Sequence, residues 1–174
     1  MSISIPKIGF SAYSGTGKTT LIKQVIPLLK AEGLRITVIK HAHHNFELDI
    51  PGKDSYDLRK SGADQTIICT ATRMAVINEF ADSTEEPSLE KIVASLDPDE
   101  VDIVLVEGYK HFRFSKIELH RKSLGKPYMH LNDDSIIAIA CDAALPHSIN
   151  IPVLDINNFE SIARFIYQDF YLNK

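Results

Sequence analysis

The stretch that most constrains the fold is FSAYSGTGKTTLIKQ, residues 10–24. It ends an apolar, β-branched run (3–12) and opens a segment whose apolar residues recur at helical spacing (19–32). A strand, a glycine-rich turn and a helix in this order form the setting of a phosphate-binding loop of the pattern G-x-x-x-x-G-K-[ST]. Ala12 replaces the first glycine, which matters little because a strand can end at alanine wherever φ stays negative. The stretch therefore predicts that the chain binds the phosphates of a nucleotide.

The chemistry of such a loop gives each of its residues a role. Backbone N–H groups turn toward the β-phosphate at the positive end of the following helix, and the glycines allow a close approach. Lys18 is expected to reach the β- and γ-phosphates, Thr19 to ligate Mg²⁺ through its hydroxyl, and Thr20 to lie near the α-phosphate. The predicted cradle consists of Ser14, Gly15, Thr16, Gly17, Lys18, Thr19 and Thr20.

Strands alternate with helices along the rest of the chain, which predicts an α/β sandwich of three layers with helices on both faces of a mostly parallel sheet. Two short strands, 64–70 and 73–80, are joined by a tight turn and should be antiparallel, so the sheet is expected to be mixed. Nothing resembles a linker or a repeat, and residues 1–174 are predicted to form one P-loop nucleotide-binding domain.

Charge and composition exclude several classes of function. The net charge of −4 and the absence of a basic run argue against a nucleic-acid partner and a polybasic membrane anchor. No apolar run approaches the length of a bilayer span, no signal peptide is visible, and a cytoplasmic protein is expected. Cys69 and Cys141 lie in apolar runs and are predicted to be buried, reduced thiols.

A carboxylate follows the most apolar predicted strand. Glu107 ends the run IVLVE, at the edge of an open α/β sheet where ligands bind. There it is placed to hold a magnesium-bound water or to orient the water that attacks the nucleotide. Glu107 is therefore the candidate catalytic residue and, with Thr19, a candidate magnesium ligand.

The segment KHAHH (40–44) leaves the second predicted strand at the same edge. Its histidines offer two interpretations, a soft-metal site of His41, His43 and His44, or contact of Lys40 and these histidines with phosphate or substrate. Asp49 and Asp54 follow in a loop long enough to serve as a nucleotide-sensing switch, with Asp54 a further candidate for magnesium.

Recognition of the base has only a weak signal. No [NT]-K-x-D motif is present, and Asp142 at a strand end is the one candidate to accept hydrogen bonds from guanine. Arg59 and Lys60 fit equally well as solvated helix charges or as anion contacts.

Several segments together resemble the molybdopterin-guanine dinucleotide biosynthesis protein B (MobB) family. They are AYSGTGKTTL, VIKHAHH, DIPGKDSYDLRKSGA, LVEGYKH and IPVLDINNFESIARFI, spread over nearly the whole chain. The resemblance implies a GTP-binding adaptor with weak GTPase activity that assists a MobA-type guanylyltransferase in molybdenum cofactor biosynthesis. It also implies a homodimer, molybdopterin or its guanine dinucleotide as a further ligand, and a nucleotide-site role for Gly108 and Tyr109 in the V-E-G-Y element.

Two other functions stay open at the level of sequence. One is a small-molecule kinase or synthetase of the P-loop class, with Glu107 and Lys40 beside the acceptor, and the other is a metallochaperone GTPase that uses the three histidines. The lysine-in-trans mechanism of ParA/MinD-type ATPases is excluded, because Tyr13 stands where they carry lysine.

Overall fold

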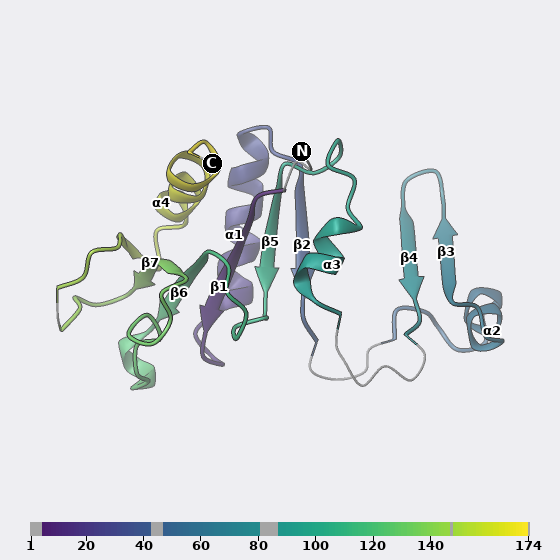
Figure 1. Cartoon of the computed structure of the whole chain (residues 1–174), viewed down its shortest axis with the longest axis horizontal. Coiled ribbons are helices and arrows are strands. Elements are labelled where there is room, and N and C mark those ends of the chain that lie inside the picture. The colour runs from purple at the N-terminus through teal and green to yellow at the C-terminus, as the bar shows by residue number, and fades with distance from the viewer. Residues whose placement is uncertain (1–4, 43–46, 81–86, 147, 174) are drawn as a thin grey trace. The chain divides into compact units, whose positions relative to one another are not determined.

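The computed structural model describes residues 5–42, 47–80, 87–146 and 148–173, in two compact units (Figure 1). The first unit comprises residues 1–41 and 89–174 and contains the phosphate loop, and the second comprises residues 42–88. Each unit is described by itself below. The expectation that both belong to one folded domain stays a prediction.

The first unit is built on a parallel sheet. Among the described residues six strands pair in the order β2-β5-β1-β6-β7-β8, and every neighbouring pair is parallel. Because all strands point the same way, their carboxyl ends meet at one edge, where Phe10 pairs with Glu107. The strands are β1 (Lys7–Ala12), β2 (Ile36–Lys40), β5 (Ile103–Glu107), β6 (Lys116–His120), β7 (Ile136–Cys141) and β8 (Val153–Asp155).

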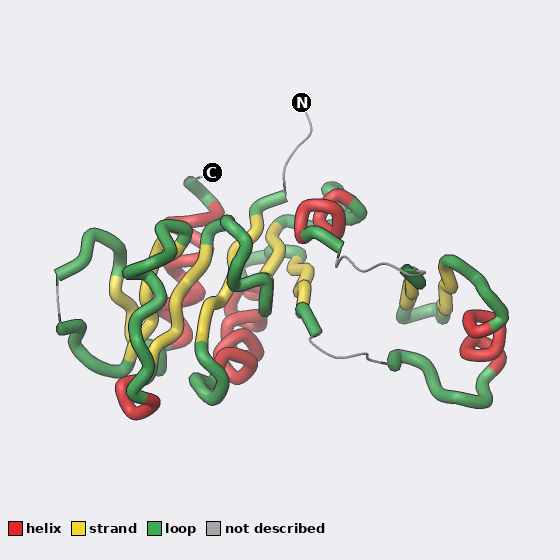
Figure 2. Tube along the Cα trace, turned by 60° about the horizontal axis from the view of Figure 1, so that its bottom comes forward, coloured by secondary structure: helices red, strands yellow, loops and turns green. Residues whose placement is uncertain are grey.

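Helices cover both faces of this sheet, as Figures 1 and 2 show. On one face α1 (Lys18–Ala31) packs with α4 (Phe159–Arg164) and its π-helical extension η2 (Phe165–Tyr171) over an apolar core. On the other face the short α3 (Leu89–Ala94) packs over β2 and β5. The predicted three-layer α/β fold is confirmed, and β5 is buried on both faces as its continuous apolar run indicates.

The second unit contains α2 (Asp54–Lys60) and the hairpin of β3 (Gln65–Cys69) and β4 (Met74–Asn78). The two strands are antiparallel, as predicted, but they form a sheet of their own. The expectation that they make the main sheet mixed is therefore wrong for the described residues.

Two side chains of the second unit settle earlier expectations. Arg59 is buried and paired with Glu47 and Glu79, so it is neither a solvated charge nor an anion contact. Cys69 is exposed, because alternate residues of a two-stranded sheet face outward, and only Cys141 is buried as predicted.

The start of α4 is capped by Asn158, although Asn157 with Glu160 resembles a capping box in the sequence. The Asn158 side chain accepts the hydrogen bond from Ser161 N at 2.8 Å, and Asn157 bonds to Arg121 instead. In the part of the chain that the structure describes, no helix has the length and apolarity needed to cross a bilayer.

Candidate functional site: the phosphate loop

The loop between β1 and α1 has the conformation of an anion cradle. Gly15 and Gly17 have positive φ angles of 82° and 92°, a region that a side chain would disfavour. Thr16 is buried, and both its backbone N–H and its hydroxyl donate to the carbonyl oxygen of Tyr13. The loop is thus braced by its own hydrogen bonds, and α1 presents its N-terminal N–H groups at Lys18.

Several polar side chains predicted for the site lie around the carboxylate of Glu107. The Thr19 hydroxyl donates to Glu107 Oε1 at 3.2 Å, and Lys18 Nζ lies 4.0 Å from the same oxygen. From the end of β2, Lys40 Nζ lies 3.9 Å from Glu107 Oε2. Side chains of α1 and β2 therefore converge on a carboxylate of β5 beside the phosphate loop.

The chemistry of this cluster fits Mg²⁺. A hydroxyl and a carboxylate are hard oxygen donors, and Mg²⁺ is commonly bound by one or two such groups together with phosphate oxygens and water. Thr19 and Glu107 would hold the ion, and Lys18 would meet the phosphates. Bound Mg²⁺ would neutralise phosphate charge at this position.

The V-E-G-Y element is held tightly against the end of β2. The backbone N–H of His41 donates to Glu107 O at 2.8 Å, and the His41 ring lies 4.8 Å from the ring of Tyr109. Gly108 has φ of 106°, and a Cβ there would lie 2.5 Å from Cβ of His41, so only glycine fits without a shift. Tyr109 itself has positive φ and is buried. His41 and Tyr109 thus fix the backbone that carries Glu107.

Asp142 lies at the end of β7 and is already engaged. Its Oδ1 accepts the backbone N–H of Lys122 at 2.9 Å, and Arg121 Nη1 lies 3.6 Å from Oδ2. The Lys122 hydrogen bond and the charge of Arg121 hold the pKa of Asp142 below its ordinary value. Asp142 is therefore an ionised, partly satisfied acceptor, and its contact with guanine stays a prediction.

Arg121 is the functional candidate that the sequence analysis missed. From the end of β6 its Nε donates to the carbonyl oxygen of Thr16 at 3.0 Å, and its Nη2 donates to Asn157 at 3.2 Å. It joins the phosphate loop to Asp142 and to the start of α4. A single arginine after a predicted strand has no motif, so only its position next to β1 in the sheet could have indicated this role.

The remaining candidates belong to the second unit or lie outside the described residues. Asp49 and Asp54 belong to the second unit, where Asp49 Oδ1 accepts from Ile50 N and Asp54 begins α2. Their assignments to nucleotide and magnesium stay predictions. His43 and His44 lie outside the described residues, and among the described ones no group of three or more His, Cys, Asp or Glu side chains is arranged to hold a metal.

Comparison with known proteins places this geometry in a family. The sequence model of "molybdopterin guanine dinucleotide synthesis protein B" (MobB) matches residues 7–142, from β1 to Asp142. The chain belongs to the MobB family. The molybdopterin-guanine dinucleotide biosynthesis adapter protein of Escherichia coli K12 is 44% identical over 94% of this chain and 93% of its own. The adapter protein of Haemophilus influenzae is 40% identical over 95% and 90% of the two chains.

Solved MobB structures share the fold. The crystal structure of molybdopterin-guanine biosynthesis protein B superposes with a TM-score of 0.74 at 25% identity, over 94% of this chain and 98% of the other. Bacillus subtilis MobB also gives a TM-score of 0.74, at 21% identity over 95% and 98% of the chains, and supports the fold alone. The MobB match includes the phosphate loop, the V-E-G-Y element and Arg121 in one segment.

Proposed function

We propose that this MobB family member is a GTP-binding adaptor in the synthesis of molybdopterin guanine dinucleotide. The observation that carries the proposal is the convergence of Lys18, Thr19 and Lys40 on Glu107 beside a braced phosphate loop. The relatives that match most of the chain are named adapter proteins of this biosynthesis, which supports the role outside the loop.

In the proposal each part of the site has a task. The loop from Ser14 to Thr20 binds the phosphates, Thr19 and Glu107 hold Mg²⁺, and Lys40 and His41 stand beside the γ-phosphate. Glu107 also orients water for a slow hydrolysis of GTP, which serves as a switch or a leak. The chain works as a cytoplasmic homodimer, binds a MobA-type guanylyltransferase, and meets molybdopterin or its guanine dinucleotide in that complex.

A substitution of Glu107 should affect GTP hydrolysis and GTP binding to different extents. Glu107→Gln keeps an oxygen acceptor for Thr19 but removes the charge, so GTP turnover should fall more than GTP affinity. Single-turnover hydrolysis and equilibrium binding measured on the same preparation compare the two. A larger loss in affinity than in turnover would make Glu107 a structural residue rather than a catalytic one.

The adaptor role is tested by complex formation with a molybdenum cofactor guanylyltransferase. Calorimetric titration of the two proteins should give a saturable complex, and its affinity should change with GTP but not with ATP. Lys18→Ala should abolish the effect of GTP, whereas Lys23→Ala, an exposed lysine on the same helix, should preserve it. No complex under any nucleotide condition would reject the adaptor role, and an equal effect of ATP would reject guanine specificity.

A further inference from the structure

The face of β6 turned away from α1 carries three buried ionisable residues. Lys116, Glu118 and His120 alternate with the apolar Ile117 and Leu119, and the first two are each only 1% exposed. Ser11 of β1 pairs with Glu118 in the sheet and is also buried. Burying such groups is unfavourable unless each is bonded, so this polar stripe requires an explanation.

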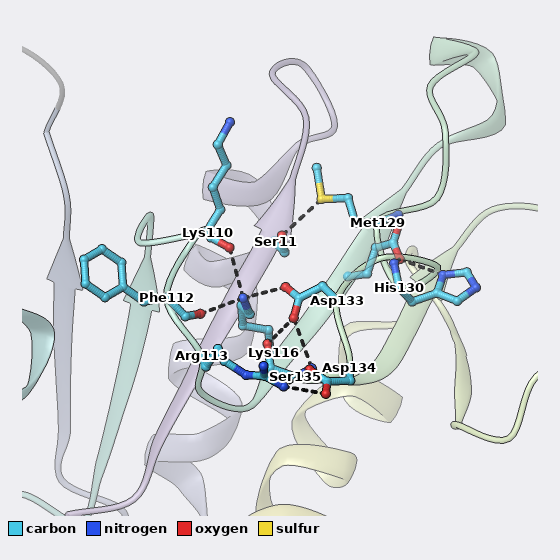
Figure 3. Close-up of polar contacts among 11 residues, drawn as sticks. Ser11, Lys110, Phe112, Arg113, Lys116, Met129, His130, Asp133, Asp134 and Ser135 are labelled. Carbon is cyan, nitrogen blue, oxygen red and sulfur yellow. Dashed lines mark hydrogen bonds and ion pairs between the residues drawn. The ribbon is translucent and has the colours of Figure 1, made fainter.

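Each residue of the stripe fastens a loop over the sheet. Lys116 Nζ donates to the carbonyl oxygens of Lys110 and Phe112 and pairs with Asp133 at 2.7 Å, as Figure 3 shows. Lys116 therefore ties the loop between β5 and β6 to the loop between β6 and β7. Burial raises the pKa of Asp133, but its hydrogen bonds from Lys116 and Ser135 outweigh burial and hold that pKa below the ordinary value.

The other two residues, Glu118 and His120, hold the same loop between β6 and β7. Glu118 accepts from the backbone N–H groups of Met129 and His130 and from His130 Nδ1 at 2.8 Å. His120 Nε2 contacts Lys126 O at 2.9 Å, and its ring stacks on Tyr128 at 4.0 Å. Gly9 allows this arrangement too, because a Cβ there would lie 2.6 Å from the ring of Phe114.

Between the fastened loops lies a cavity of about 470 Å³, a size typical of small-molecule sites. Its lining combines the rings of Tyr13, Phe112 and Tyr128 with the cationic or basic groups of Lys110, His111 and Arg113. The cavity adjoins the phosphate loop, since the carbonyl oxygen of Tyr13 braces Thr16.

The charges of the side chains that line the cavity indicate which class of ligand it would bind. Lys116 is neutralised by Asp133, and Arg113 by Asp134. Lys110 is exposed, and among the described residues no carboxylate forms an ion pair with it. In Figure 3 its side chain extends away from the Lys116 network. A lysine without a carboxylate partner and several aromatic side chains in the lining of one cavity favour a planar ligand with one acidic group.

We propose that this cavity is a second ligand site for a planar heterocyclic acid that packs on the aromatic side chains and pairs with Lys110; it borders the phosphate loop at Tyr13 but includes none of the phosphate-binding residues 14–20. The cavity itself does not depend on the proposed function, which guides only the choice of a pterin as the probe. The probe is 6-carboxypterin, a planar bicyclic ring with one carboxylate, and unsubstituted pterin is its matched neutral control.

Methionine labelling reports on the site in the unmutated chain. The sequence has three methionines, of which Met129 lines the cavity and accepts from Ser11, and Met74 lies in β4 of the second unit. With ¹³C-methyl methionine, 6-carboxypterin should shift the Met129 signal in a saturable way and leave the Met74 signal in place. Met129→Leu assigns the signal. A Met129 signal that never moves would overturn the proposal.

Affinity measurements then test the ion pair. Lys110→Ala should weaken 6-carboxypterin binding about tenfold, as should removal of the carboxylate from the probe, whereas Lys23→Ala should change nothing. GTP should not displace the probe, and Lys18→Ala should still bind it. Displacement by GTP, or loss of the probe in Lys18→Ala, would place the ring in the phosphate loop and overturn the second site. Failure to bind GTP at all would reject the proposed function without affecting this result.

Discussion

The two faces of β6 are both buried, yet they do different things. Ile117 and Leu119 belong to the apolar core under α1 and α4, where their contribution is burial. Lys116, Glu118 and His120 on the opposite face hold two loops through hydrogen bonds and ion pairs. The apolar face stabilises the whole sheet through burial, and the polar face stabilises the two loops that surround the site. Burial alone does not distinguish a stabilising residue from one that organises a binding region.

The largest effect should come from the polar face. Lys116→Ala removes the buried charge that pairs with Asp133 and leaves the carbonyl oxygens of Lys110 and Phe112 without their donor, at a cost of about 3–5 kcal/mol. Chemical denaturation measures this loss in the free energy of unfolding. Hydrogen exchange should show that residues 108–115 and 126–134 lose more protection than α1. A loss spread evenly over the whole first unit would contradict the division between the faces.

The apolar face should respond next. Ile117→Ala creates a cavity in a fully buried cluster and should lower the free energy of unfolding by about 3 kcal/mol. Because no loop is fastened through Ile117, hydrogen exchange should accelerate throughout the sheet and α1, and 6-carboxypterin should still shift Met129. Selective loosening of the two loops in this variant would remove the distinction between the faces.

The next effect concerns the phosphate loop itself, to which Arg121 is bonded through Thr16. Arg121→Ala removes a charged donor from Thr16 O and should weaken GTP binding about tenfold, or about 1.4 kcal/mol. Arg121→Lys should not restore it, because an ammonium cannot reach Thr16, Asp142 and Asn157 with the geometry of a guanidinium. Arg164→Ala, an exposed arginine of α4, is the control. Unchanged affinity in Arg121→Ala would leave Arg121 without a role at the site.

The smallest effect is the pH dependence of the polar face. The pKa of Asp133 is lowered in the folded chain, so its contribution to stability is complete above the ordinary value of 3.8 and is lost as the pH falls through the lower folded pKa. The difference in unfolding free energy between the wild type and Asp133→Asn should therefore shrink on acidification below that value. A difference that stays constant down to the acid limit would show that Asp133 acts through its shape and not its charge.

What the sequence could predict was local. The phosphate loop is a contiguous motif between a strand and a helix, so the convergence of Lys18 and Thr19 with Glu107 follows from the motif and from where parallel strands end. The alternation KIELH of β6 is usual for a strand with one face in water, and it does not indicate that loops bury that face.

What the sequence could not predict depends on distant contacts. Arg121 and the Thr16 carbonyl are 105 residues apart, and only the parallel pairing of β1 and β6 brings them together. The antiparallel pairing of β3 with β4 was predicted correctly, but the sequence of a turn does not indicate which sheet its hairpin joins. Asn157 and Asn158 are equally suitable caps for α4 by residue type, and in the structure Asn158 caps the helix while Asn157 accepts from Arg121.

The most direct test of the account is the equilibrium binding of GTP to the wild type, Lys18→Ala and Thr19→Ala, each measured with Mg²⁺ and with a chelator. Lys18→Ala should lose about two orders of magnitude in affinity because it removes a charge-assisted contact with phosphate. Thr19→Ala should lose most of the dependence on Mg²⁺ while binding free GTP nearly as well as the wild type. GTP binding that is unchanged by Lys18→Ala, or a magnesium dependence that is unchanged by Thr19→Ala, would contradict the assignment of the phosphate loop and Glu107 as the nucleotide site.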